Sequence, residues 1–140
     1  MPALRPAWKP LILVVDDSPT HVAMLRQALE RADYRVSVAA TGRQALQVTR
    51  EIGPDLQLMD VVMPDMKGYQ ATRKLTRSQV TAHIPVILSS SKNQESDRVW
   101  GLRQGAVDYI VKPFEELDLL RRIAHALVAR QTPKRRVRQP

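Results

Sequence analysis

Five residues have side chains and spacing suited to phosphoryl chemistry. Asp16 and Asp17 directly follow one apolar run, Asp60 directly follows another, and Ser90 and Lys112 come after two later ones. Three carboxylates held together repel one another, and a hard divalent cation such as Mg²⁺, which prefers oxygen ligands, relieves that repulsion. A hydroxyl and an ammonium group beside such a site hold the oxygens of a phosphoryl group, and a carboxylate can accept that group covalently. The set therefore predicts Mg²⁺-assisted phosphoryl transfer to Asp60.

Each of these residues taken alone has an ordinary explanation. An Asp after a strand often caps a helix or forms a turn, Ser90 could cap in the same way, and Lys112 could be solvated. The prediction therefore depends on the whole set. Zinc would require nitrogen or sulfur ligands, and His21, His83 and His125 show no paired ligand spacing. We expect the three histidines to be ordinary surface or interface residues.

Short apolar runs of strand length alternate with segments of helical periodicity. The predicted strands are residues 11–15, 34–39, 56–59, 84–88 and 107–111. Ser18-Pro19 and Thr41 are typical helix starts, and Gly105 is typical of a helix end. Strict alternation with short connections predicts parallel strands joined by right-handed crossovers, with helices on both faces of the sheet. The fold class is therefore α/β.

This architecture places the five residues at one edge. Ligand sites in open α/β sheets lie beyond the carboxyl ends of the strands. If the first and third strands are neighbours, the three carboxylates converge there. Two residues fit less well, since buried parallel strands favour apolar side chains. Gln57 requires a partner or partial exposure, and Ser89 extends the fourth run.

Composition indicates one globular domain without disulfides. The chain has 140 residues, of which 44% are hydrophobic, and no cysteine, which excludes a thiolate nucleophile and a Cys-based zinc site. It shows no apolar run of signal-peptide length and no stretch of the roughly 20 apolar residues that span a bilayer. We expect a cytoplasmic protein without membrane insertion.

The net charge of +8 belongs mostly to the two ends. We predict an N-terminal extension over 1–10, a folded domain over 11–130 and a basic, disordered tail over 131–140. The cations of the C-terminal end are Arg130, Lys134, Arg135, Arg136 and Arg138. The tail could contact nucleic acid or membrane phosphates, or could simply be solvated. A DNA-binding module has no room after the last predicted helix.

Four motifs resemble those of the CheY-like receiver domain of response regulators. They are VVDDS at 14–18, LMDVVMPDMKG at 58–68, IPVILSSSK at 84–92 and GAVDYIVKPF at 105–114. The resemblance implies a flavodoxin-like, doubly wound parallel sheet of five strands in the order 2-1-3-4-5, with five helices. QATRKL at 70–75 and NQESDRVWGLRQGA at 93–106 are similar to stand-alone regulators of chemotaxis-like and twitching-motility systems, the PilG/PilH type.

The resemblance also implies a role for each acid of the site. Asp60 would accept the phosphoryl group from the phosphohistidine of a histidine kinase of the CheA-like kind. Asp17, Asp60 and the backbone carbonyl of Val62 would bind Mg²⁺ directly, and Asp16 would act through water. The chain would then be a phosphoacceptor that assists its own phosphorylation and dephosphorylation, with no separate substrate turnover.

The remaining implied roles concern the switch. Ser90 would bond the phosphoryl group and Lys112 would pair with it, and the Lys112-Pro113 peptide bond would be cis. Tyr109 would turn inward when the domain switches, although an ordinary partly buried Tyr is the alternative. A downstream protein would then recognise the surface of the fourth helix, fifth strand and fifth helix. Trp100 and Arg103 are candidates on that surface, although an exposed Trp could equally cover the core edge.

Three other functions compete with this hypothesis. A phosphohydrolase of the haloacid-dehalogenase kind requires an Asp-x-Asp motif, whereas Asp16 and Asp17 are adjacent. Nucleic-acid binding would depend on the basic tail alone. A docking module that works unphosphorylated would not need the acceptor, hydroxyl and lysine together. The oligomeric state expected for a receiver is a monomer or a phosphorylation-dependent dimer.

Overall fold

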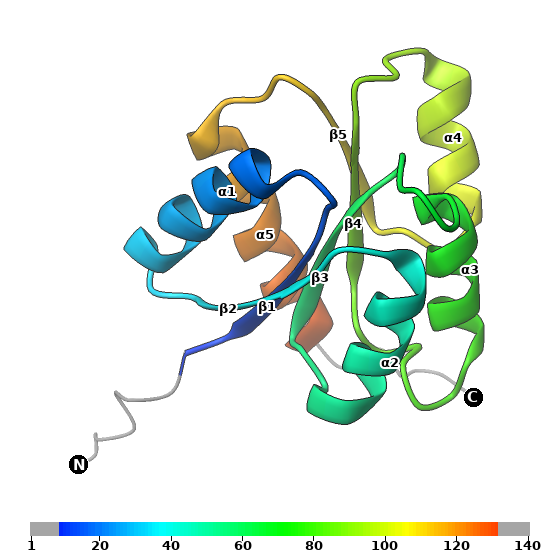
Figure 1. The fold of residues 1–140 in the computed structure, drawn as a ribbon, viewed down its shortest axis with the longest axis horizontal. Helices are drawn as coiled ribbons and strands as arrows, with labels where there is room; N and C mark the ends of the chain where they lie inside the picture. Colours follow the sequence, from blue (N-terminus) through cyan, green and yellow to red (C-terminus); the bar gives the residue numbers. More distant parts are fainter. Residues whose placement is uncertain (1–8, 132–140) are drawn as a thin grey trace.

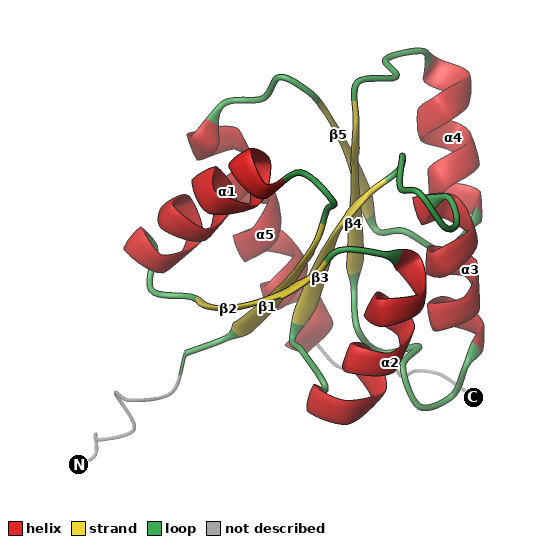
Figure 2. Ribbon diagram, viewed as in Figure 1, coloured by secondary structure: helices red, strands yellow, loops and turns green. Residues whose placement is uncertain are grey.

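Five strands alternate strictly with five helices in the computed structural model, which describes residues 9–131 (Figure 2). The strands are β1 (Leu11–Val15), β2 (Arg35–Ala39), β3 (Leu56–Asp60), β4 (Val86–Ser90) and β5 (Asp108–Val111). The helices are α1 (Pro19–Arg31), α2 (Gly42–Ile52), α3 (Gly68–Arg77), α4 (Glu95–Arg103) and α5 (Glu116–Gln131). The alternation of strands and helices predicted from the sequence, and the order of these elements, are therefore confirmed.

The strands form one parallel sheet in the order β2-β1-β3-β4-β5, which confirms the predicted topology. Strand β1 pairs with both β2 and β3, and Val15 lies opposite Met59 at the carboxyl ends of β1 and β3. Helices α1 and α5 cover one face of the sheet, and α2, α3 and α4 cover the other (Figure 1). The loops that follow β1, β3, β4 and β5 therefore leave from the same edge.

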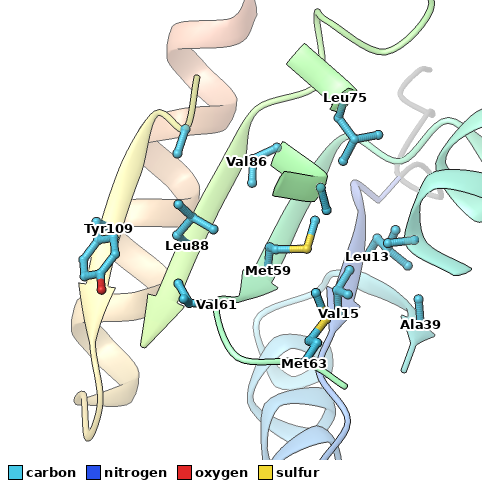
Figure 3. Packing of buried hydrophobic residues seen from close by; sticks show 13 residues of the cluster. Leu13, Val15, Ala39, Met59, Val61, Met63, Leu75, Val86, Leu88 and Tyr109 are labelled. Carbon is cyan, nitrogen blue, oxygen red and sulfur yellow. The ribbon is translucent and has the colours of Figure 1, made fainter. Parts of the chain in front are cut away.

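Alternate side chains of each strand fill two apolar cores, one on each face. Leu13 and Val15 point to the face of α2, α3 and α4, where Figure 3 shows them with Met59 and Leu88. The residues between them along β1 pack against α1 and α5 on the other face. Strands buried on both faces read as continuous apolar runs, because neither side of the sheet meets water. These two cores hold the strands in place, and the candidate site lies at the carboxyl ends of those strands.

The predicted helix boundaries are confirmed at three positions. Ser18 Oγ accepts a hydrogen bond from His21 N, with Pro19 as the first residue of α1. Thr41 Oγ1 accepts one from Gln44 N at the start of α2. Gly105 follows α4 with a φ of 109°, a conformation that favours glycine.

Four strand predictions require correction at their ends. The third strand extends to Asp60 instead of ending at residue 59, and the fifth begins at Asp108 instead of residue 107. The fourth strand is Val86–Ser90 and not 84–88, because Pro85 has no N–H and Ile84 N donates instead to a turn carbonyl, that of Thr81. The second strand begins at Arg35, since the N–H of Tyr34 donates to the last turn of α1 at Leu29.

Gln57 has neither of the two environments expected for it, which were a hydrogen-bond partner or partial exposure. Its side chain is 0% exposed, and neither its amide nitrogen nor its carbonyl oxygen has a hydrogen-bond partner. A buried polar group without a partner costs on the order of 1–3 kcal/mol. Nothing in the structure explains its choice over an aliphatic residue. Ser89 is also buried, and its backbone oxygen accepts from Val61 N.

The chain ends are described only in part. Residues 1–8 of the predicted extension and 132–140 of the predicted tail lie outside the described residues, whereas Gln131 belongs to α5. Lys9 and Pro10 lie against β2, since their backbone oxygens accept hydrogen bonds from Arg35. Within residues 9–131, no helix has the length and apolar character needed to cross a membrane.

Candidate functional site

The five residues singled out in the sequence lie together at the carboxyl edge of the sheet. Asp16 and Asp17 follow β1, and Asp60 is the last residue of β3; one carboxylate oxygen from each lies within 4.8 Å of the others. Lys112, directly after β5, places its Nζ 3.0 Å from Asp60 Oδ1 and 3.8 Å from Asp16 Oδ2. Ser90 is the last residue of β4, next to β3 in the sheet. Four strand ends therefore contribute to one site.

Burial makes the charge on Asp60 costly. Asp60 is 8% exposed and Asp16 is 3% exposed, whereas Asp17 is exposed to solvent. Burial raises the pKa of Asp60, the hydrogen bond and charge of Lys112 lower it, and the charges of Asp16 and Asp17 raise it again, so that the pKa lies above its ordinary value. In this structure the lysine ammonium is the main counter-charge of the acidic cluster.

The donor set fits a hard divalent cation. Its ligand atoms are all carboxylate oxygens, which Mg²⁺ prefers, and its net charge is negative. Opposite ligands of an octahedral Mg²⁺ lie about 4.2 Å apart, so a set within 4.8 Å is compatible with direct ligands, or with one ligand that acts through water. Val62, the fourth predicted ligand, lies in the exposed loop two residues after Asp60.

The raised pKa of Asp60 predicts a change in stability with pH. Because the folded state holds the proton more tightly than the unfolded state, its stability falls as pH rises from the ordinary aspartate value of 3.8 through the raised value. We expect Asp60→Asn to remove that loss and to stabilise the metal-free protein at pH 7 by about 1 kcal/mol. Urea unfolding at pH 4 and pH 7 measures it; an equal stability of the two proteins at pH 7 would contradict the prediction.

Ser90 and Tyr109 are linked through one backbone segment. Ser90 Oγ accepts a hydrogen bond from Lys92 N at 3.0 Å, and Tyr109 donates its hydroxyl proton to Lys92 O, also at 3.0 Å. Ser90 is 1% exposed and Tyr109 is 3% exposed, so the tyrosine ring is buried, as Figure 3 shows. The loop after β4 is thus bonded through Lys92 both to Ser90, at the end of β4, and to Tyr109 of β5.

His21 belongs to the site, which the sequence reasoning missed. Its Nδ1 contacts Asp16 Oδ2, its side chain is 17% exposed, and its ring lies 6.1 Å from that of Phe114. Asp16 Oδ1 accepts a hydrogen bond from Ser18 N at 2.9 Å. Both oxygens of Asp16 are therefore held by the first turn of α1. The available signal was position, since His21 lies in the first turn of a helix that begins two residues after Asp17.

The loop after Asp60 is held by one backbone hydrogen bond and by two hydrogen bonds to the Asp65 carboxylate. Gly68 N, at the start of α3, donates to Val61 O at 2.7 Å. Asp65 accepts hydrogen bonds from Gly42 N and Arg43 N at the start of α2. The loop after Asp60 is thus fixed to the first turns of both helices.

The other predicted residues lie as follows. The Lys112-Pro113 peptide bond is cis. Trp100, on α4, is 49% exposed and lines a hollow between α3 and α4. Arg103 is exposed in the last turn of α4. His83 and His125 line a separate cavity with Arg122 near the opposite edge of the sheet.

Fold and site together define a receiver domain. Residues 12–124 match the response regulator receiver domain family, and the chain belongs to that family. It is 48% identical over 112 residues to Protein PilH of Pseudomonas aeruginosa, an alignment that covers 80% of this chain and 93% of PilH. It is 40% identical to a probable cyclic di-GMP phosphodiesterase of Vibrio cholerae over 81% of this chain, but spans 25% of that longer protein.

Solved structures agree with this assignment. A putative response regulator from Chloroflexus aurantiacus superposes with a TM-score of 0.83 and 32% identity, and the match covers 86% of this chain and 99% of that one. The receiver domain of the sensor histidine kinase PA1611 from Pseudomonas aeruginosa, with a magnesium ion coordinated in its active-site cleft, gives a TM-score of 0.80 at 30% identity, with 86% and 99% covered. The chain is therefore the receiver domain of a two-component response regulator.

Proposed function

We propose that Asp60 accepts a phosphoryl group from the phosphohistidine of a histidine kinase and that the receiver uses it as a switch. The observation that carries the proposal is the position of Lys112 Nζ, 3.0 Å from Asp60 Oδ1 and beside two further carboxylates. A buried carboxylate with an ammonium group in contact, at a site that suits Mg²⁺, has what an acceptor needs.

The transfer is an in-line displacement at phosphorus. An oxygen of Asp60 forms the new O–P bond while the P–N bond of the phosphohistidine breaks, and the imidazole nitrogen keeps the bonding electrons. Lys112 offsets the charge on the phosphoryl oxygens, and the backbone of β3 fixes the direction of attack. Asp17, Asp60 and the Val62 carbonyl would hold Mg²⁺, with Asp16 acting through water. That ion supplies charge neutralisation for the transferring group.

Ser90 and Tyr109 are the proposed switch. A phosphoryl group on Asp60 adds acceptor oxygens that compete for the Ser90 hydroxyl, on the neighbouring strand. Any movement of Ser90 disturbs the bond from Lys92 N, and Lys92 O in turn holds the Tyr109 hydroxyl. A change at the acceptor therefore reaches β5 through one short loop.

The surface of α4, β5 and α5 is the proposed output. A hollow of about 720 Å³ lies there, partly lined by Tyr109, Val111 and Leu117, and the last two are exposed apolar residues. Since the chain spans nearly all of PilH, we propose a stand-alone, cytoplasmic regulator of chemotaxis-like or twitching motility, supplied by a CheA-like kinase.

Metal removal tests the acceptor chemistry directly. We expect the purified full chain with Mg²⁺ and a small acyl phosphate to gain one phosphoryl group, and chelation by EDTA to slow that gain about a hundredfold or more, because several kcal/mol of charge stabilisation are lost. Intact-protein mass spectrometry over time measures the rate. Equal rates with and without EDTA would contradict a metal-assisted acceptor.

A further inference from the structure

The charges of the domain are segregated along the chain. Between Asp65 and Glu95 the sequence contains no Asp or Glu. The same stretch contains five Lys and Arg residues, namely Lys67, Arg73, Lys74, Arg77 and Lys92. Since the domain as a whole is close to neutral, this stretch forms a local positive surface.

Three of these five cations, Arg73, Lys74 and Arg77, lie on α3 and line a groove between α3 and α2. The two helices pack side by side (Figure 1). The groove has a volume of about 650 Å³ and is lined by Leu46, Arg50, Gln70, Arg73, Lys74, Arg77 and Ser78. The four cations come from both helices, and all four are exposed. Among the described lining residues there is no carboxylate.

None of the four cations has an acidic partner within residues 9–131. The ion pairs of the described chain involve other arginines and lysines, whereas Arg50, Arg73, Lys74 and Arg77 form no side-chain ion pair or hydrogen bond. Arg73 and Arg77 are four residues apart on α3, where like charges destabilise a helix slightly. The groove therefore carries an uncompensated charge that an external anionic partner would neutralise.

A second hollow continues the groove on the other side of α3. Lys67, Tyr69, Gln70, Arg73, Trp100 and Gln104 line it, so Gln70 and Arg73 belong to both. Trp100 is 49% exposed at this edge. Exposed Trp and Arg side chains are the residues that most often dominate binding energy at protein interfaces.

We propose that the α2–α3 groove docks an acidic, amphipathic helix of a partner protein. Its glutamates or aspartates would pair with Arg50, Arg73, Lys74 and Arg77, and its apolar side chains would contact Leu46. A groove between two helices accepts one helix along its length. Single-stranded nucleic acid fits less well, because such strands stack on successive aromatic rings. The α2–α3 groove has no aromatic lining residue, and Tyr69 and Trp100 lie in the second hollow on the other side of α3.

This surface is distinct from the proposed output surface of α4, β5 and α5, since the residues that line the two hollows do not overlap. The proposal does not depend on phosphorylation of Asp60. It assigns the receiver a second docking site.

Fluorescence anisotropy of the full chain tests the proposal with a labelled helical peptide that has leucines on one face and glutamates on the other. We expect the double variant Arg73→Gln with Arg77→Gln to weaken binding about tenfold. The matched control, Arg26→Gln with Arg31→Gln on α1, removes the same charge outside both the groove and the proposed output surface and is expected to change binding less than about twofold. The basic C-terminal residues are the same in every protein, so their contribution cancels.

Charge reversal separates docking from misfolding. We expect Arg73→Glu with Arg77→Glu to prefer the same peptide with lysines in place of glutamates. The proposal is overturned if a peptide with glutamines in place of glutamates binds the wild type equally well, or if the groove and control variants lose binding equally. It is also overturned if a single-stranded oligonucleotide binds more tightly and the groove variants abolish that binding.

Discussion

Asp60→Asn is expected to abolish phosphoryl gain by the chain from a small acyl phosphate in the presence of Mg²⁺. The amide lacks the anionic oxygen that attacks phosphorus, and it removes one of the three carboxylates of the cation site. The two nearby carboxylates are less suited to the reaction. Asp16 is held through both oxygens by Ser18 and His21, and Asp17 is exposed and, among the described ion pairs, has none with Lys112.

The measurement is intact-protein mass spectrometry at matched times, followed by peptide mapping of the wild type. Asp33→Asn serves as the control, because it makes the same chemical change at an exposed residue with a φ of 69°, where Asn is well tolerated. We expect the control to accept a phosphoryl group at the wild-type rate. A mass gain on the Asp60→Asn protein would show that another residue is the acceptor.

The candidate site could be predicted from the sequence because its residues stand at strand ends. Asp16, Asp17, Asp60 and Lys112 each stand at the end of an apolar run, and parallel strands bring their carboxyl ends to one edge. What the periodicity left open was whether β1 and β3 are neighbours. The family resemblance supplied the strand order, and the observed register confirms it.

Features that depend on contacts between elements were beyond the sequence. His21 shows no ligand spacing, and its contact with Asp16 arises because α1 begins immediately beside the acid pair. Trp100 was either a candidate on the surface of α4, β5 and α5 or a cover for the core edge, and the packing of α4 beside α3 places it in the hollow between these two helices. The basic groove joins Arg50 of α2 with cations of α3, which are distant in sequence. Contacts of this kind between distant residues can be recognised only once the packing of the helices is known.

Gly68→Ala is expected to destabilise the protein by about 3 kcal/mol, because the site tolerates no Cβ. A Cβ at this position would lie 2.3 Å from the backbone oxygen of Asp60 and 2.9 Å from Val61 Cα. These atoms are backbone, so the start of α3 or the end of β3 must move. The gain in helix propensity from Gly to Ala, at most about 1 kcal/mol, does not offset this. Urea unfolding of both proteins measures the difference in free energy.

The same contact ties stability to function. Gly68 lets the first turn of α3 approach the backbone carbonyl of Asp60, and its N–H donates to Val61 O at 2.7 Å. Displacement of that turn shifts Asp60 relative to Lys112, so the variant should also accept phosphate more slowly. Gly53→Ala is the matched control, since Gly53 has a φ of 57° but nothing within 4 Å of its Cβ position. It should cost only about 1 kcal/mol of backbone strain and leave the phosphorylation rate unchanged. Equal destabilisation by the two substitutions would mean that the close approach of backbone atoms to the Cβ position of Gly68 does not cause the loss of stability.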